Sequence, residues 1–164
     1  MDTLDVQIGE VKFAQSGKLA SKAIGSCIAV ASYDNSKRTG ALAHIMLPGK
    51  APTDCPAPNR YAVNAINTIV KKMTHNGSTL ADIRISLVGA ANVLRKPEDT
   101  ICAANLRSTL RTLRSFGLHI STAALGGTQR RTICLDIESG NIFYTEGDSG
   151  QMLLTDRNLA PAII

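Results

Sequence analysis

Two apolar runs joined by a short polar turn constrain the fold of this chain more than any other feature. Residues 24–33 read IGSCIAVASY without a charge, and after the turn-rich segment DNSKRTG the chain resumes as ALAHIM at residues 41–46. Apolar runs of this length, bounded by turn residues, are typical of buried strands. The sequence therefore predicts a buried β-hairpin in the first third of the chain.

Further along the chain, the spacing of apolar residues predicts two core-facing helices. The first spans residues 61–76, and Asn76-Gly77 supplies its stop. The second spans residues 99–116, with Gly117 as its cap. The side chains expected to point inward are Val63, Ile66, Val70 and Met73 in the first helix, and Ile101, Leu106, Leu110 and Leu113 in the second.

Strands are expected in most of the remaining chain. An N-terminal strand over residues 5–13 is interrupted at Gly9-Glu10 by a bulge or a tight hairpin, and the proline-rich residues 47–60 form a loop. Further strands are expected at residues 82–88, 119–124, 131–137 and 142–144, with a weaker one at 151–154. Because strands outnumber helices without regular alternation, the sequence predicts a single layered α+β domain over residues 1–164. Its sheets are mixed or antiparallel, with about two main helices packed on one side.

Composition excludes several classes of protein. The chain has 164 residues, of which 44% are hydrophobic and 19% charged, as is typical of one globular domain. Three acids in the first ten residues do not fit a signal peptide, and no apolar run is long enough to span a membrane. The four cysteines lie 28, 47 and 32 residues apart, without a CxxC pair. We therefore expect a cytoplasmic protein with free thiols that is not inserted in a membrane.

The formal net charge of +5 permits an anionic partner. Only three Phe, three Tyr and no Trp are present, so aromatic stacking platforms are scarce and we expect no nucleic-acid partner. Arg107, Arg111 and Arg114 form a basic row on the second predicted helix. This row is either a solvated face or a docking surface for an acidic partner.

Cys27 follows two small residues, Gly25 and Ser26, that allow a substrate to approach the thiol. Backbone N–H groups in such a segment could face a developing oxyanion, which makes Gly25 and Ser26 the candidate substrate or oxyanion region. An ordinary buried cysteine in an apolar strand is the alternative interpretation.

His44 interrupts the apolar run ALAHIM, where a buried imidazole needs partners for its nitrogens. A cysteine needs such a neighbour to become a thiolate near neutral pH, so we expect Cys27 to be the most reactive of the four thiols. Symmetric closure of the hairpin at Tyr33 opposite Ala41 sets His44 opposite Val30, and contact with Cys27 then requires a register shift or a twist. A hydrogen-bonded core histidine is the alternative.

Residues 25–48, GSCIAVASYDNSKRTGALAHIMLP, resemble the signature of the CheD family of chemoreceptor glutamine deamidases. In that family a Gly-Ser-Cys strand and an Ala-His-x-Met-Leu-Pro strand carry the catalytic pair. The resemblance covers about residues 6–144. The other motifs that follow in the family's order are Arg60-Tyr61, Gly89-Ala90-Ala91-Asn92, Asn105, Gly126-Gly127 and Arg131.

The resemblance implies cysteine-dependent deamidation of selected glutamines on methyl-accepting chemotaxis receptors, giving glutamate and ammonia through a thioester. The family's Cys-His-Thr triad corresponds to Cys27 as nucleophile, His44 as base and acid, and Ser21 at the usual threonine position, with no metal or organic cofactor. Ser21 keeps the hydroxyl and loses the methyl group that would restrict its rotamer.

The resemblance also implies docking to receptors or to a CheC-type phosphatase. The sequence departs from the family at Ala90, Cys102 and Ala104. These departures keep a second function open, that of a non-catalytic CheD-like adaptor binding receptors or a CheC-type phosphatase, whereas the intact Cys27 and His44 favour the enzyme.

Overall fold

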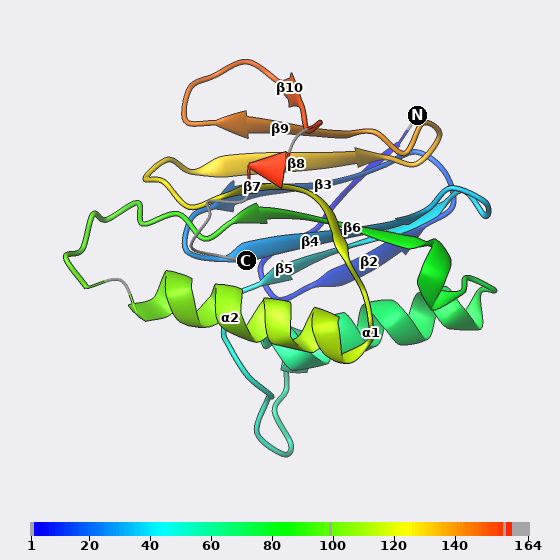
Figure 1. Ribbon diagram of the computed structural model, residues 1–164, viewed down its shortest axis with the longest axis horizontal. Helices are drawn as coiled ribbons and strands as arrows, with labels where there is room; N and C mark the ends of the chain where they lie inside the picture. The colour runs from blue at the N-terminus through cyan, green and yellow to red at the C-terminus, as the bar shows by residue number, and fades with distance from the viewer. Residues whose placement is uncertain (1, 99, 156, 159–164) are drawn as a thin grey trace.

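The computed structural model of the protein describes residues 2–98, 100–155 and 157–158. In this part of the chain, two α-helices, a six-stranded sheet and a five-stranded sheet are stacked as three layers (Figure 1). One apolar core lies between the helices and the six-stranded sheet, and a second lies between the two sheets. The layered α+β class with the helices on one side is thereby confirmed.

Both sheets are mixed. The six-stranded sheet has the order β11-β7-β6-β4-β5-β2, in which β7 is parallel to both β6 and β11. The five-stranded sheet has the order β1-β3-β8-β9-β10, in which β1 and β3 are parallel. The strands of the first sheet are β2 (Val11–Ala14), β4 (Ile28–Asp34), β5 (Thr39–Ile45), β6 (Ile83–Gly89), β7 (Ile120–Leu125) and β11 (Arg157–Asn158). Those of the second are β1 (Thr3–Asp5), β3 (Lys18–Ile24), β8 (Arg131–Asp136), β9 (Ile142–Glu146) and β10 (Met152–Leu153).

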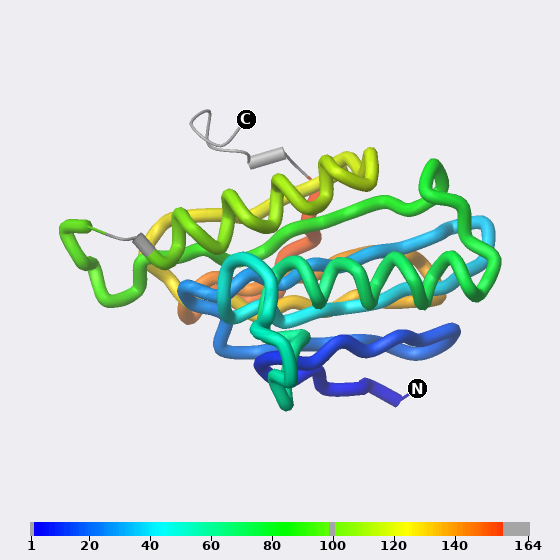
Figure 2. The backbone as a smooth tube through the Cα atoms, turned by 90° about the horizontal axis from the view of Figure 1, so that it is seen from below, coloured from blue at the N-terminus to red at the C-terminus, as the bar shows by residue number. Residues whose placement is uncertain are grey.

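The helices α1 (Ala62–His75) and α2 (Thr100–Ser115) lie side by side across the six-stranded sheet (Figure 2). Short 3-10 helices, η1 (Pro58–Arg60) and η2 (Leu80–Asp82), precede and follow α1. Both α-helices end as predicted, because Gly77 and Gly117 have φ values of 96° and 70°. The next N–H in each case bonds a carbonyl oxygen five residues earlier, at 3.0 Å. Asp99, the predicted start of the second helix, lies outside the described residues. Within these residues, no helix combines the length and apolar character needed to cross a membrane.

One predicted core position in α2 is wrong. Ile101 is 52% exposed, whereas Leu110 and Leu113 are buried as expected and Leu106 packs against the core from a partly buried position. Ile101 belongs to the first turn of α2 and lines a pocket beside Cys27. The apolar side chain of Ile101 therefore lines that pocket and is not part of the core.

The hairpin of β4 and β5 is buried on both faces, which explains why its sequence does not alternate. Ile28 and Val30 pack toward the helices, and Ala29 and Ala31 pack toward the second sheet. The predicted hairpin is thus confirmed, although its first strand begins at Ile28 and not at residue 24.

The predicted register of this hairpin is wrong by one residue. Tyr33 pairs with Gly40, and His44 pairs with Ala29. The turn is shorter than the symmetric closure assumed, because Asp34 pairs with Thr39 and its carboxylate accepts backbone N–H bonds inside the four-residue turn.

The N-terminal prediction is also wrong. Residues 5–13 form neither one bulged strand nor a hairpin, because β1 joins the five-stranded sheet and β2 joins the six-stranded sheet. The strand β3 was not predicted at all. Its sequence, KLASKAI, carries two lysines and few large apolar residues, yet Leu19, Ser21 and Ile24 are buried.

Candidate active site

Cys27 lies in a three-residue bend between β3 and β4. The N–H groups of Ala90 and Ala91, just after β6, donate to the carbonyl oxygens of Cys27 and Gly25 at 2.8 and 2.9 Å. Gly89 has a φ of 132°, and a Cβ there would collide with the Cys27 carbonyl oxygen. Only glycine permits this close approach, so the backbone around β6 holds the bend in place.

The side chain of Cys27 is half-buried and lines a pocket of about 270 Å³. Gly25 and Ser26, the candidate oxyanion region, line the same pocket, as do Ile101 and Cys102. Within the described residues, the N–H groups of Ser26 and Cys27 donate no bond to another main-chain group. Unpaired backbone N–H groups beside a nucleophile are the usual donors to an oxyanion.

His44 and Ser21 are joined by a hydrogen bond in the interior of the protein, each only 1% exposed. Ser21 Oγ lies 2.8 Å from His44 Nδ1 and donates its own proton to the carbonyl oxygen of Val6 at 2.7 Å. Since the hydroxyl has one proton, it must accept from Nδ1–H of His44. The two bonds therefore fix the imidazole as the Nδ1–H tautomer and leave Nε2 as the basic nitrogen.

His44 and Cys27 lie on the same side of the six-stranded sheet, toward the second sheet. His44 pairs with Ala29, whose side chain belongs to the core between the two sheets. Cys27, two residues before Ala29, packs against the same core between the sheets. Nε2 of His44 is buried without a hydrogen-bond partner among the described residues, so its lone pair is free. Catalytic hydrogen bonds often tighten only when the substrate is bound.

Burial favours the neutral forms of both groups. It lowers the pKa of His44 from 6.5 to about 4. Burial also raises the pKa of the Cys27 thiol above its ordinary value, a rise that a hydrogen bond from its own backbone N–H partly offsets. The resting pair is therefore a thiol and a neutral imidazole, and not the thiolate near neutral pH that the sequence led us to expect.

Asn105 is a positioning residue that sequence reasoning noted only through the resemblance. It lies on α2, fully buried, and its Nδ2 donates to the carbonyl oxygens of Ser26 at 3.0 Å and Met46 at 3.1 Å. It thus ties the cysteine bend to the residue that follows β5. A polar amide on the apolar face of a helix was the signal that could have identified this role.

Arg131 supports the same region from β8. Its guanidinium donates to the carbonyl oxygens of Gly89 at 3.2 Å and Gly126 at 2.8 Å, and pairs with Glu146 at 3.2 Å. Arg131 is 5% exposed. It therefore holds the backbone of Gly89, which approaches Cys27 closely, and it is not among the residues that line the pocket.

A thiol in a pocket, with a tautomer-fixed imidazole on the same side of the sheet, is typical of cysteine-dependent hydrolases. A family model described as CheD chemotactic sensory transduction matches residues 46–146. A probable chemoreceptor glutamine deamidase CheD from Chlorobium luteolum is 39% identical over 150 residues, which cover 90% of this chain and 75% of that protein. The chain belongs to the CheD family.

Two further comparisons are more distant. The chemoreceptor glutamine deamidase CheD of Thermotoga maritima is 28% identical over 150 residues, which cover 90% of this chain and 94% of that protein. Among solved structures, the hypothetical protein YfiH of Bacillus licheniformis aligns with a TM-score of 0.45 and 13% identity, covering 72% of this chain and 49% of that one. The second likeness is too remote to inform function.

Proposed function

We propose that this protein deamidates particular glutamine side chains on chemoreceptors, with Cys27 as nucleophile, His44 as base and acid, and Ser21 as the group that orients His44. The printed names of the relatives support the reaction. The observation that carries the residue assignment is the pair of hydrogen bonds at Ser21. Together they hold one imidazole tautomer and leave its basic nitrogen free for the thiol proton.

Acylation begins with the neutral pair. The thiol proton of Cys27 passes to Nε2 of His44 as Sγ attacks the side-chain carbonyl carbon of glutamine. Negative charge develops on the oxygen, within reach of the N–H groups of the cysteine bend. When the C–N bond breaks, His44 returns its proton to the nitrogen, ammonia leaves, and a thioester remains on Cys27.

Deacylation uses water as the only co-reactant. Nε2 of His44 takes a proton from the water that attacks the thioester carbon, and the C–S bond then breaks. The proton returns to Sγ, which restores the Cys27 thiol and releases a glutamate side chain. In each half-reaction His44 becomes positively charged for a moment, and Ser21 Oγ accepts a stronger hydrogen bond from it then.

The test is to incubate the protein with a cytoplasmic fragment of a chemoreceptor and to follow glutamate formation by mass spectrometry together with ammonia release. Cys27→Ala should abolish both. Cys134→Ala is the matched control, because Cys134 is another half-buried free thiol, on β8, that does not line the pocket. Binding without glutamate formation by the wild-type protein would instead support the adaptor.

A further inference from the structure

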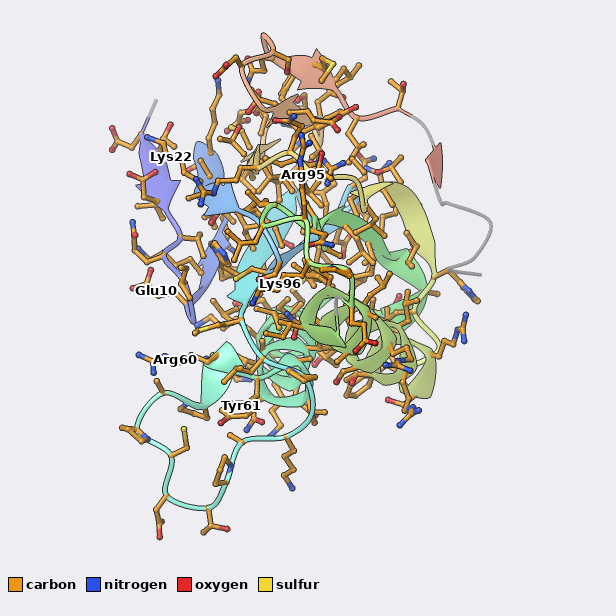
Figure 3. All side chains as sticks on the ribbon, turned by 90° about the vertical axis from the view of Figure 1, so that its left-hand side faces the viewer. Glu10, Lys22, Arg60, Tyr61, Arg95 and Lys96 are labelled. Atoms are coloured by element: carbon orange, nitrogen blue, oxygen red, sulfur yellow. The ribbon has the colours of Figure 1, made fainter. Side chains whose placement is uncertain are left out.

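The mouth of the active-site pocket carries positive charge from separate elements. Lys96 and Arg130 line the pocket. Arg95 precedes Lys96 in the loop before α2, and Lys22 precedes Ala23, another residue of the pocket wall. We call Lys22, Arg95, Lys96 and Arg130 the basic rim, and all four are exposed. Figure 3 faces this end of the molecule and labels Lys22, Arg95 and Lys96.

The described part of the chain does not neutralise this charge. Among the described residues, no carboxylate lines the pocket. The ion pairs found among the described residues join Lys12 to Glu10 and Arg131 to Glu146, so none of the basic rim takes part. Glu98, close to Lys96 in the sequence, is exposed and forms no ion pair among these residues. The rim therefore presents free positive charge to a docking partner.

The loop that carries two of these cations is held in shape before any partner arrives. Asn92 Nδ2 donates to the carbonyl oxygen of Lys96 at 2.8 Å, and Asn92 Oδ1 accepts from the Lys96 N–H at 3.1 Å. The N–H of Arg95 donates to the carbonyl oxygen of Asn92 at 3.1 Å. The N–H of Asn92 donates to the carbonyl oxygen of Gly127 at 2.8 Å. A loop fixed in this way loses less backbone entropy when its side chains bind a partner.

We propose that the basic rim selects glutamines that have glutamate or aspartate as neighbours in the partner protein. This rests on the proposed deamidase function. The amide of glutamine is neutral, so cations at the mouth act on the residues beside it and not on the reacting group itself. The partner surface is therefore an acidic polypeptide segment, and the formal net charge of +5 favours its approach.

Two kinetic consequences follow. Exposed charge pairs are individually weak, so one pair changes kcat/KM by about threefold and two reversed cations change it by about tenfold at low salt. Salt screens such pairs, and the effect should shrink to about twofold at 0.5 M salt. In addition, each deamidation adds a carboxylate to the partner, so a glutamine beside a converted site becomes a better substrate.

The test compares two versions of one chemoreceptor cytoplasmic fragment that carry a single target glutamine flanked either by glutamates or by lysines. Each is presented to the wild-type protein and to the double variant Lys96→Glu/Arg130→Glu. The control is Lys37→Glu/Lys71→Glu, which makes the same charge change. Its residues are exposed in the β4–β5 turn and near the end of α1. These two segments lie at the opposite end of the molecule from the loop before α2 (Figure 1). Glutamate formation is measured in these proteins, and binding is measured after Cys27→Ala is added to each.

The wild type and the control should prefer the glutamate-flanked fragment about tenfold at low salt, and the double variant should prefer the lysine-flanked one. Equal kcat/KM for wild type and double variant on both fragments would overturn the basic rim while the deamidase stands. If no fragment is deamidated but binding still follows the charge swap, the rim stands as a docking surface for acidic protein segments and the deamidase falls. Absence of both effects overturns both proposals.

Discussion

Removing the Ser21 hydroxyl perturbs the site at one atom. Ser21→Ala leaves the His44 Nδ1–H and the Val6 carbonyl oxygen without their partner, in a place where Ser21 and His44 are each 1% exposed. A buried polar group left unsatisfied costs about 1–3 kcal/mol, and for a chain of this size each kcal/mol lowers Tm by about 2–4 °C. We therefore expect Ser21→Ala to melt about 2–12 °C below the wild type.

The same substitution should slow the reaction. His44 carries positive charge in both half-reactions, and a hydrogen bond to a charged group contributes about 1.5–3 kcal/mol. Loss of that amount from the transition state lowers kcat by about 10- to 150-fold. Ser21→Thr keeps the hydroxyl and should retain or raise kcat.

The assay pairs ammonia release from a chemoreceptor fragment with calorimetric melting. Ser32→Ala is the matched control, because Ser32 is fully buried on β4 but its hydroxyl has no partner among the described residues. It should leave kcat unchanged and Tm unchanged or higher. A Ser21→Ala protein with wild-type turnover would refute the orienting role and leave a Cys27–His44 dyad.

Three further results are expected. Because burial holds the pKa of His44 at about 4, below its ordinary 6.5, stability should be complete above about pH 6.5 and fall by about 3 kcal/mol toward pH 4. In denaturant unfolding experiments, His44→Gln should lack this part of the pH dependence of stability. An unchanged pH dependence would contradict the lowered pKa of His44. Since burial raises the pKa of the Cys27 thiol, its alkylation by iodoacetamide should keep rising through pH 9, whereas a plateau near neutral pH would indicate a resting thiolate. Gly89→Ala should lower the free energy of unfolding by about 2–3 kcal/mol. The loss should be smaller for Gly49→Ala, because φ is also positive there but a Cβ would contact nothing. Equal losses for the two variants would show that the close approach at Gly89 has no special role.

The parts of the fold predicted from sequence are those with a strong local pattern. The hairpin of β4 and β5 reads as two uncharged runs because both of its faces are covered. The ends of α1 and α2 follow from Gly77 and Gly117, since a left-handed residue there stops a helix. These patterns involve only residues close together in the chain, so they can be recognised in a single sequence.

The missing parts depend on contacts between distant segments. The strand β3 has little apolar character of its own and becomes a strand because β1 and β8 pair with it. The N-terminal segment was misassigned because nothing in residues 5–13 tells that β1 and β2 join different sheets. Register failed for a different, local reason, because the carboxylate of Asp34 accepts N–H bonds inside the turn and shortens it.

The site shows the same division. Cys27 and His44 stand out in sequence as polar groups in apolar runs, but Ser21 was identified only through the family resemblance. Its partner, the carbonyl oxygen of Val6, is fifteen residues away in sequence and has no side-chain signal. The neutral resting pair also could not be predicted, because it follows from the depth of burial and not from residue type.

The most direct test of the proposed mechanism is acid quenching of the protein a short time after mixing with a chemoreceptor fragment, followed by mass spectrometry of the intact species. The mechanism predicts a covalent complex in which the two chains are joined through Cys27 with the loss of one ammonia. The complex should decay into free protein and a fragment that carries glutamate. Glutamate formation that continues at the wild-type rate in Cys27→Ala, without a covalent complex in the wild type, would contradict it.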